Sequence, residues 1–255
     1  MVPLYRRRLG GVEPQPPFSI LARVYDRLMD DVPYEGWARF VLAVLGAEGC
    51  FPRSVLELGV GTGSALAPFL ERGLEAAGVD ASAAMLARAR AKLPDVPLLQ
   101  ADVRSFDLGR RFDLVYSAFD SLNNLTDPAD LAAALGCARA HLNPGGWLAA
   151  DLNTPEGLRE LWREEVWEEG GVRLVYGYDP QTRLGRLEAW VGSEHEVHLE
   201  RGYEPDEVRA MLEGLGFGPV FCLTFPEGRA PDLLADRFWV FARAPGAHPA
   251  QAGRA

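Results

Sequence analysis

The chain has 255 residues, 48% of them hydrophobic, so it is long enough to bury one large core. Its formal net charge of −10 works against a nucleic-acid groove, and we expect no nucleic-acid partner. No stretch has the apolar length that spans a bilayer, and the first residues lack the apolar segment of a signal peptide. Three widely spaced cysteines indicate reduced thiols, so we predict a cytoplasmic protein with no membrane partner and no metal.

Apolar side chains at helical spacing predict two helices ahead of the first strand, over Ile20–Leu28 and, after Pro33, over Trp37–Leu45. Strands and helices then alternate, which predicts an α/β fold with a doubly wound, mostly parallel, seven-stranded sheet of Rossmann-like form. The expected strands are 55–58, 75–79, 97–100, 112–117 and 146–152, and the expected helices are 64–72, 82–93 and one that begins at Pro128 behind Asp127.

The pattern changes after Pro155. Residues 165–200 alternate with period two and carry turn residues at regular intervals, which predicts an inserted antiparallel β ribbon. A helix from Glu204 to Gly216 and an antiparallel hairpin of two strands, near 220–225 and 237–242, complete the sheet at its edge. The expected division is a flexible arm 1–17, a helical cap with the cofactor-binding core 18–154, the ribbon or lid 155–203, the completed core 204–243 and a flexible tail 244–255.

The stretch VLELGVGTGS, residues 55–64, is an apolar strand followed by glycines at alternate positions, Gly59, Gly61 and Gly63. A dinucleotide site needs a glycine three residues after the second one, where this chain has Ser64. Glu57 lies just before the loop, and its carboxylate repels a pyrophosphate but attracts an ammonium or sulfonium group. The loop therefore favours a cationic ligand over a pyrophosphate, with a purely structural turn as the alternative.

Two further carboxylates follow the next two strands. Asp80 can accept hydrogen bonds from both hydroxyls of a ribose, although it could instead cap the helix that begins near Ser82. Asp102 can accept from the amino group of an adenine while the N–H of Val103 meets a ring nitrogen, although surface turns are common here. Three carboxylates at the ends of successive strands, with Glu57 as the first, are harder to explain by turns than by one adenosine-type ligand.

Together these residues resemble the class I S-adenosylmethionine-dependent methyltransferases, in their small-molecule branch. VLELGVGTGS, GVDASAAML and ADVRSF are similar to the first three motifs of that family, and FDLVYSAFDSLNNL and LNPGGWLAADL to its strand-four and strand-five motifs. The resemblance spans about residues 20–242 and implies an enzyme that transfers a methyl group from S-adenosyl-L-methionine to a small-molecule acceptor. The cofactor-binding residues that it implies are Tyr25, Glu57, Gly59, Gly61, Gly63, Asp80, Ala81, Met85, Asp102, Val103 and Phe119.

The resemblance also implies which part of the cofactor each of these residues would contact. The glycine loop would hold the methionine portion, with Glu57 toward its amino group and Phe119 near the methionine or adenine portion. Met85 would pack on the adenine, although a methionine on a helix is more often part of the core. Tyr25 would close over the sulfonium, although its place on an apolar stripe suits a core tyrosine equally well.

No catalytic residue is apparent, because in-line methyl transfer often needs alignment more than a strong base. Asp120, Asn123 and Asn153 lie just beyond strands four and five, where they could orient or deprotonate the acceptor or make turn and helix-cap hydrogen bonds. His195 and His198 are three residues apart in a strand and should face opposite sides, so we do not expect them to share a metal.

The acceptor class is argued mostly from missing motifs. Strand four lacks the Asn-Pro-Pro-Tyr or Asp-Pro-Pro-Tyr motif of enzymes that methylate exocyclic base nitrogens, and no Pro-Cys pair supplies a cytosine nucleophile. A small molecule is the first choice of acceptor, a protein side chain the second and RNA the third. A nicotinamide-dependent oxidoreductase and a non-catalytic cofactor-binding protein stay open, although the former would not explain Glu57, Asp102 or the terminal hairpin. The ribbon is expected to roof the acceptor pocket or to form a homodimer contact.

Overall fold

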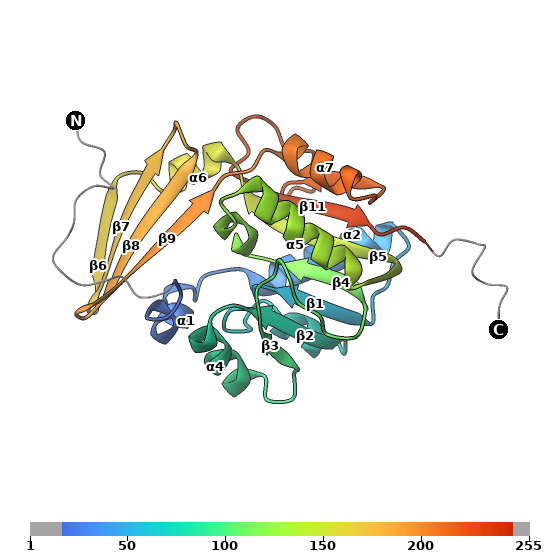
Figure 1. Cartoon of the computed structure of the whole chain (residues 1–255), viewed down its shortest axis with the longest axis horizontal. Coiled ribbons are helices and arrows are strands. Elements are labelled where there is room, and N and C mark those ends of the chain that lie inside the picture. Colours follow the sequence, from blue (N-terminus) through green and yellow to red (C-terminus); the bar gives the residue numbers. More distant parts are fainter. Residues whose placement is uncertain (1–16, 247–255) are drawn as a thin grey trace.

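The structure is a computed structural model that describes residues 17–246. The flexible arm and tail that the sequence predicts lie almost wholly outside the described residues. Two β-sheets organise the described part, a central seven-stranded sheet and a four-stranded sheet at one end of it (Figure 1). No helix in residues 17–246 is long and apolar enough to cross a membrane.

The seven-stranded sheet has the order β10-β11-β5-β4-β1-β2-β3. Neighbours from β5 to β3 pair in parallel, whereas β11 pairs antiparallel with both β5 and β10. The doubly wound sheet and its closing antiparallel hairpin are therefore confirmed. The strands are β1 (Ser54–Leu58), β2 (Glu75–Asp80), β3 (Leu98–Gln100), β4 (Phe112–Ser117), β5 (Leu142–Asn153), β10 (Val220–Leu223) and β11 (Arg237–Arg243).

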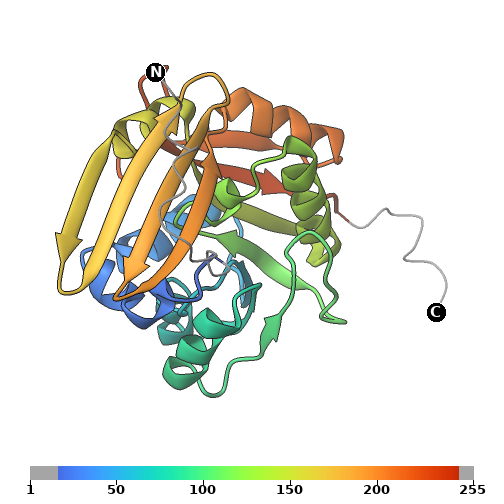
Figure 2. The ribbon, with the colours of Figure 1, turned by 60° about the vertical axis from the view of Figure 1, so that its left-hand side comes forward.

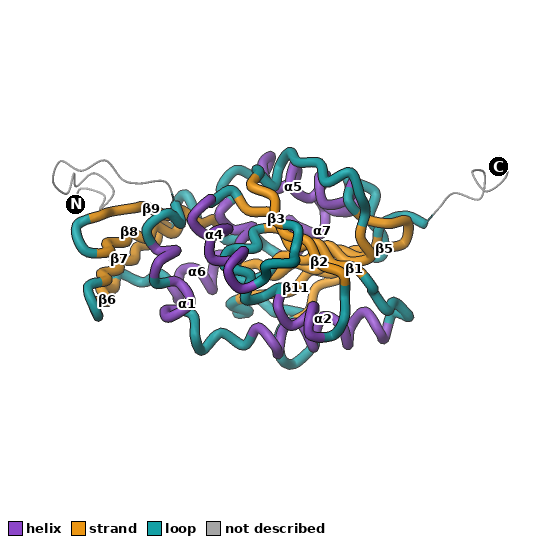
Figure 3. Tube along the Cα trace, turned by 90° about the horizontal axis from the view of Figure 1, so that it is seen from below, coloured by secondary structure: helices purple, strands orange, loops and turns teal. Residues whose placement is uncertain are grey.

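Helices cover both faces of this sheet, with α5 and α2 on opposite sides (Figure 3). Two separate buried clusters result, one that includes Leu131 of α5 and Leu212 of α7 and another that includes Val41 of α2 and Phe69 of α3. The helical elements are η2 (Leu21–Arg23), α1 (Tyr25–Leu28), α2 (Tyr34–Ala47), α3 (Ala67–Glu71), α4 (Ala83–Lys92), η3 (Ser121–Asn124), α5 (Pro128–Ala140), α6 (Pro155–Leu161) and α7 (Pro205–Gly214).

Helix ends follow the local chemistry of the chain. The Asp127 side chain accepts from the N–H of Ala129, which confirms the predicted start of α5. The helix predicted from Ser64 begins only at Ala67, because Pro68 is tolerated only in the first turn of a helix. The helix predicted over residues 20–28 is wrong as a single element, since it breaks at Val24 into a 3-10 turn and one turn of α-helix.

The ribbon is a four-stranded antiparallel sheet of order β6-β7-β8-β9, as its period-two pattern predicts (Figure 2). Its strands are β6 (Glu165–Glu169), β7 (Val172–Asp179), β8 (Leu184–Val191) and β9 (Glu194–Arg201). One face packs on the N-terminal helices η2 and α1, which together with the start of α2 we call the cap. Leu21 of η2 joins Val172 and Leu174 there in a small core. His195 and His198 lie on opposite faces with different carboxylate partners, Glu188 and Glu196, as expected.

A buried glutamate joins the cap to the ribbon. Glu196 of β9 is fully buried, and its carboxylate accepts from the backbone N–H groups of Ser19, Ile20 and Leu21 at 2.9, 2.8 and 3.2 Å. His198 lies 2.9 Å from the same carboxylate through Nε2. These hydrogen bonds satisfy the N–H groups at the start of the cap, and we call this arrangement the Glu196 clasp.

Candidate active site

The glycine loop lies at the carboxyl end of β1, and each of its glycines has a positive φ. A Cβ on Gly59 would lie 2.6 Å from the Cβ of Ser121, and one on Gly63 would lie 2.7 Å from a methyl carbon of Leu93. At Gly61 the nearest atom would be a backbone oxygen at 4.0 Å, so its surface is open. The loop thus needs glycine for close packing on two sides and leaves room for a ligand at the middle position.

Asp80 holds this loop in place. Its two carboxylate oxygens accept from the backbone N–H groups of Gly61, at 2.8 Å, and Ser82, at 2.7 Å. Burial raises the pKa of Asp80, and these two hydrogen bonds oppose the rise. The helix α4 is capped instead by Ser82, whose hydroxyl accepts from the N–H of Met85. Asp80 therefore connects the glycine loop to the second strand.

Glu57 is the buried carboxylate at this edge of the sheet. Only 1% of its surface is exposed, and its Oε2 has no hydrogen-bond partner. Burial, together with the nearby Asp80, raises the pKa of Glu57 well above its usual range. A buried carboxylate oxygen without a donor is costly, so the site fits a ligand that brings an ammonium group to Glu57.

A partly open space of about 30 Å³ lies between the glycine loop and the cap. Five of the predicted cofactor residues line it, and Tyr34, which sequence reasoning missed, lines it too. The five are Tyr25, Glu57, Gly59, Gly61 and Phe119. The N-terminal helices thus contact the glycine loop directly, as the cap interpretation requires.

The other predicted cofactor residues lie outside this space. Met85 is buried, with 2% of its surface exposed, whereas Ala81 is exposed and Val103 is half-buried. Asp102 is paired with Arg104, whose guanidinium donates to both carboxylate oxygens and lowers the pKa of Asp102. An adenine at this edge would meet a carboxylate that already has a cationic partner.

A second group of contacts fastens the cap to the loop and was not predicted. The Thr62 hydroxyl donates to Asp26 of α1 at 2.6 Å, and Lys92 of α4 donates to the same carboxylate at 2.7 Å. Lys92 also donates to the hydroxyls of Thr62 and Ser64. The one lysine of the chain therefore joins three elements at the site. The spacing of these residues in the sequence carries no signal of it.

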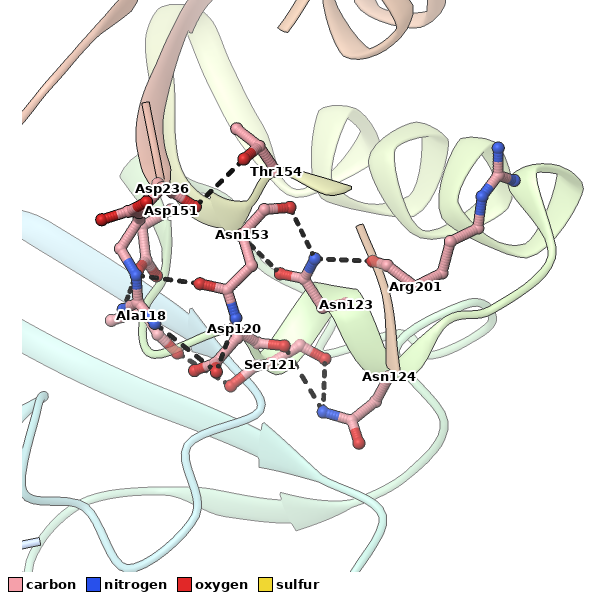
Figure 4. A network of polar contacts seen from close by, with 11 residues as sticks. Ala118, Asp120, Ser121, Asn123, Asn124, Asp151, Asn153, Thr154, Arg201 and Asp236 are labelled. Carbon is pink, nitrogen blue, oxygen red and sulfur yellow. Dashed lines mark hydrogen bonds and ion pairs between the residues drawn. The ribbon is translucent and has the colours of Figure 1, made fainter. Parts of the chain in front are cut away.

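The polar residues beyond β4 and β5 form a network (Figure 4). Asn123 uses its whole amide in it, because Nδ2 donates to the carbonyls of Asn153 and Arg201 and Oδ1 accepts from the N–H of Asn153. It therefore has a structural role, holding η3 against β5 and β9. The Asn153 side chain donates to Asp120 at 3.0 Å, and Asp120 keeps one oxygen, Oδ1, without a partner.

Arg237 of β11 enters the same network and was missed by sequence reasoning. Its guanidinium donates to Asp151 at 2.6 Å and to the Asn153 side chain at 3.2 Å, and it lies 3.5 Å from Asp120. The rings of Trp37 and Phe119 face the guanidinium at 5.7 and 5.6 Å. Phe119 thus borders both the cofactor space and the polar network.

The parallel sheet, with a glycine loop and carboxylates at its carboxyl edge, defines a Rossmann-like protein that binds a nucleoside-type cofactor. A family model described as a methyltransferase domain matches residues 55–146. The chain is 42% identical, over 194 residues, to dTDP-3-amino-3,4,6-trideoxy-alpha-D-glucopyranose N,N-dimethyltransferase of Streptomyces venezuelae, and the match covers 69% of this chain and 80% of that relative.

Two solved methyltransferase structures have folds similar to that of this chain. The sugar N-methyltransferase KedS8 from Streptoalloteichus has a TM-score of 0.68 at 26% identity, with 94% of this chain and 97% of that chain covered. A S-adenosylmethionine-dependent methyltransferase from Clostridium acetobutylicum has a TM-score of 0.78, covering 90% and 99% of the two chains, and at 20% identity it shows the shared fold alone. The chain belongs to the S-adenosylmethionine-dependent methyltransferases, and the predicted enzyme class and cofactor are confirmed.

Proposed function

We propose that this enzyme methylates an amine nitrogen of a small polar acceptor of the amino-sugar class, linked to a nucleotide. The relative with 42% identity is by name an N,N-dimethyltransferase of a dTDP-linked amino sugar, and KedS8 is by name a sugar N-methyltransferase. The observation that carries the cofactor side is the buried, unpartnered oxygen of Glu57 beside the open face of Gly61. It suits the charged amino group of the methionine portion.

The proposed cofactor site uses the residues expected from the sequence. When bound, S-adenosylmethionine supplies a methyl group that is activated by its attachment to a sulfonium. Glu57 accepts hydrogen bonds from the amino group, and Asp80 accepts from the ribose hydroxyls. Tyr25 and Phe119 surround the sulfonium and exclude water from it. The remaining proposed contacts come from Gly59, Gly61, Gly63, Ala81, Met85, Asp102 and Val103.

The acceptor side follows from the position of the ribbon. We propose that residues 155–203 form a lid, because β9 contacts η3 through Asn123 and contacts the cap through the Glu196 clasp. The outer face of the ribbon exposes Val166 and Leu199, and we propose that a second copy of the chain covers it. Light scattering tests the homodimer, which would be excluded by a monomer mass that persists at micromolar concentrations.

Calorimetric titration with S-adenosylmethionine, S-adenosylhomocysteine and NADH tests the cofactor site. We expect micromolar binding of the first two and none of NADH. The acceptor is tested with dTDP-3-amino-3,4,6-trideoxy-α-D-glucopyranose and the matched sugar that has a hydroxyl in place of the amine, with release of S-adenosylhomocysteine as the readout. Turnover of the hydroxyl sugar alone would overturn the amine proposal, as would turnover of neither.

A further inference from the structure

Three carboxylates and one guanidinium meet beside the cofactor space. Asp120 lies just after β4, Asp151 on β5 and Glu200 on β9, and all three carboxylates interact electrostatically with Arg237 of β11. Arg237 donates directly to Asp151 and lies 3.5 Å from Asp120. The group therefore has an excess of negative charge, which we call the carboxylate cluster.

The carboxylate cluster is removed from water. The exposed fractions are 8% for Asp120, 0% for Asp151 and 7% for Glu200. Each of the three has a buried oxygen with no hydrogen-bond partner, namely Oδ1 of Asp120, Oδ1 of Asp151 and Oε2 of Glu200. Buried carboxylate oxygens are expensive to leave unpaired, so the arrangement fits a missing cationic group.

The carboxylate cluster borders the cofactor space through Asp120, because its chain neighbours Phe119 and Ser121 both line that space. Burial raises the pKa of the Tyr25 phenol well above its usual range, and Tyr34, Asp120, Glu200 and Asp80 add to the rise. The Tyr25 phenol thus lies within the electrostatic reach of both Asp80, at the cofactor edge, and Glu200, on the ribbon. A cation held by Asp120 would therefore lie beside the space that Tyr25 and Phe119 line.

We propose that Asp120 and Glu200 bind the ammonium group of the acceptor, and that Glu200 accepts its proton. This inference rests on the proposed function, since it names the residues that recognise an amine acceptor. Asp151 is not part of the ammonium site in this proposal, because its other oxygen is held by Arg237 at 2.6 Å. The positive charge of Arg237 offsets part of the repulsion among the three carboxylates.

Transfer of a proton from the ammonium group to Glu200 leaves a lone pair on the acceptor nitrogen, which can then attack the methyl group. An N–H bond of the ammonium breaks, its proton goes to a carboxylate oxygen of Glu200, and its electron pair stays on nitrogen. That pair forms the new N–C bond to the methyl group as the C–S bond breaks and its electrons return to sulfur. Burial and the charge of Asp120 raise the pKa of Glu200 well above its usual range. Arg237 and a hydrogen bond from the Asn153 side chain oppose this rise, and Asp151 adds to it. A carboxylate in this environment is a better proton acceptor than one in water.

The test compares Glu200→Gln and Asp120→Asn with Glu188→Gln, a matched control for a half-buried glutamate on the opposite face of the ribbon. The first two changes keep side-chain shape and remove charge from the carboxylate cluster, so we expect both variants to fold. Each protein, saturated with S-adenosylhomocysteine, is titrated calorimetrically with the dTDP-linked amino sugar. We expect both cluster variants to bind it about tenfold more weakly or worse, and the control to match the wild type.

A second readout separates proton transfer from binding. The pH profile of kcat/KM for the amino sugar should rise on its acidic side in the wild type and in Glu188→Gln, and this limb should shift in Glu200→Gln. Wild-type binding and turnover that survive both cluster substitutions unchanged would overturn the inference and leave the proposed function intact. A wild-type enzyme that neither binds nor methylates the amine would overturn both. Weakened amine binding with an unchanged acidic limb would overturn the proton-acceptor role alone.

Discussion

The two halves of the active site are held together in different ways. At the cofactor edge, Asp80 is satisfied by backbone N–H groups only 19 and 2 residues away, those of Gly61 and Ser82. On the proposed acceptor side, Arg237 reaches Asp151 across 86 residues, and Asn123 reaches Arg201 across 78. Contacts between residues that lie close together in the sequence can be recognised as a short motif. Contacts between residues far apart in the sequence leave no such motif, and they can change when a segment is inserted between them.

The two halves also differ in what balances their buried negative charges. The Asp80 carboxylate is balanced by backbone dipoles, which no side-chain substitution can remove. The carboxylate cluster is balanced by one guanidinium, so its stability depends on a single residue. The comparison predicts that changes on the acceptor side disturb folding more than changes at the cofactor edge.

The largest effect is expected for Arg237→Met. It leaves three buried carboxylates without their cation, and we expect a loss of about 3–5 kcal/mol in the free energy of unfolding, measured by denaturant titration. Burial already raises the pKa of Asp151 to about 6 with Arg237 present. A carboxyl with a raised pKa in the folded state destabilises the fold as the pH rises, so the loss should be larger at pH 8 than at pH 5.

The control for this prediction is Arg243→Met, on the same strand but exposed to solvent. We expect it to change the unfolding free energy by less than about 0.5 kcal/mol. Equal losses in the two variants, or a loss in Arg237→Met that does not vary with pH, would contradict the electrostatic explanation.

A smaller effect is expected for Gly59→Ala. The new Cβ would meet Ser121 at 2.6 Å in a backbone with φ of 68°, and we expect a loss of about 2–4 kcal/mol in thermal or denaturant unfolding. Gly109→Ala has a similar φ of 66° but open space, and it should lose about 1–2 kcal/mol. The double variant Gly59→Ala/Ser121→Gly should recover part of the difference. No recovery would show that crowding against Ser121 is not the cause.

A smaller loss of stability again is expected for Glu196→Gln, which weakens the Glu196 clasp. We expect a loss of about 1–3 kcal/mol at pH 7 and faster hydrogen exchange at Ile20 and Leu21. Burial opposes ionisation, but the hydrogen bonds from His198, Ile20 and Leu21 lower the pKa of Glu196 overall. This stabilisation is therefore present above the ordinary glutamate pKa of 4.5 and is lost as the pH falls below it.

Glu194→Gln, on the same strand, is the control for the clasp, because Glu194 pairs with Arg23 in solvent. Its effect on stability should be much smaller and should decrease in high salt. A Glu196→Gln protein with wild-type exchange rates at Ile20 would mean that the apolar packing of the cap suffices without the clasp.

The smallest effects are expected for two substitutions that change the affinity for the cofactor and not the stability of the fold. Asp80→Asn should weaken S-adenosylmethionine binding about tenfold or more, because a carboxylate accepts from hydroxyls more strongly than an amide. Asp102→Asn should weaken it by less than about threefold, since Arg104 already engages that carboxylate in solvent. Calorimetry measures both, and a larger effect at Asp102 would show that Arg104 releases it on binding.

Much of the fold could be predicted because the signals are local. The glycines of the loop, the cap at Asp127 and the period-two ribbon each depend on residues a few positions apart. Glu57 and Asp80 could be found in the same way, since each ends a buried strand. The single helix predicted over residues 20–28 is instead interrupted at Val24. No local pattern predicts that the N–H groups at its start donate to Glu196, some 175 residues away in the sequence.

The proposed acceptor side could be predicted only in part. Asp120, Asn123 and Asn153 could be named because they follow strands four and five, whereas Arg237 and Glu200 could not. Arg237 reads in the sequence as one more charged residue at the start of a strand, and Glu200 as the polar member of an alternating pair. Only the pairing of β11 with β5 and the position of β9 beside η3 bring them to Asp120 and Asp151. Asp26 and Lys92 likewise gain their role from a contact between elements 66 residues apart.

The fastening of the cap has a consequence for repeated methylation. The cap is tied to the glycine loop through Asp26 and Thr62, and to the ribbon through the Glu196 clasp, around a space of about 30 Å³. We expect the exchange of spent for fresh cofactor to open the cap, and the ribbon, which we propose as a lid over the acceptor, to move with it. We therefore expect an amine that receives two methyl groups to leave between transfers. Monomethylated product should accumulate early in the reaction, as in a distributive enzyme rather than a processive one.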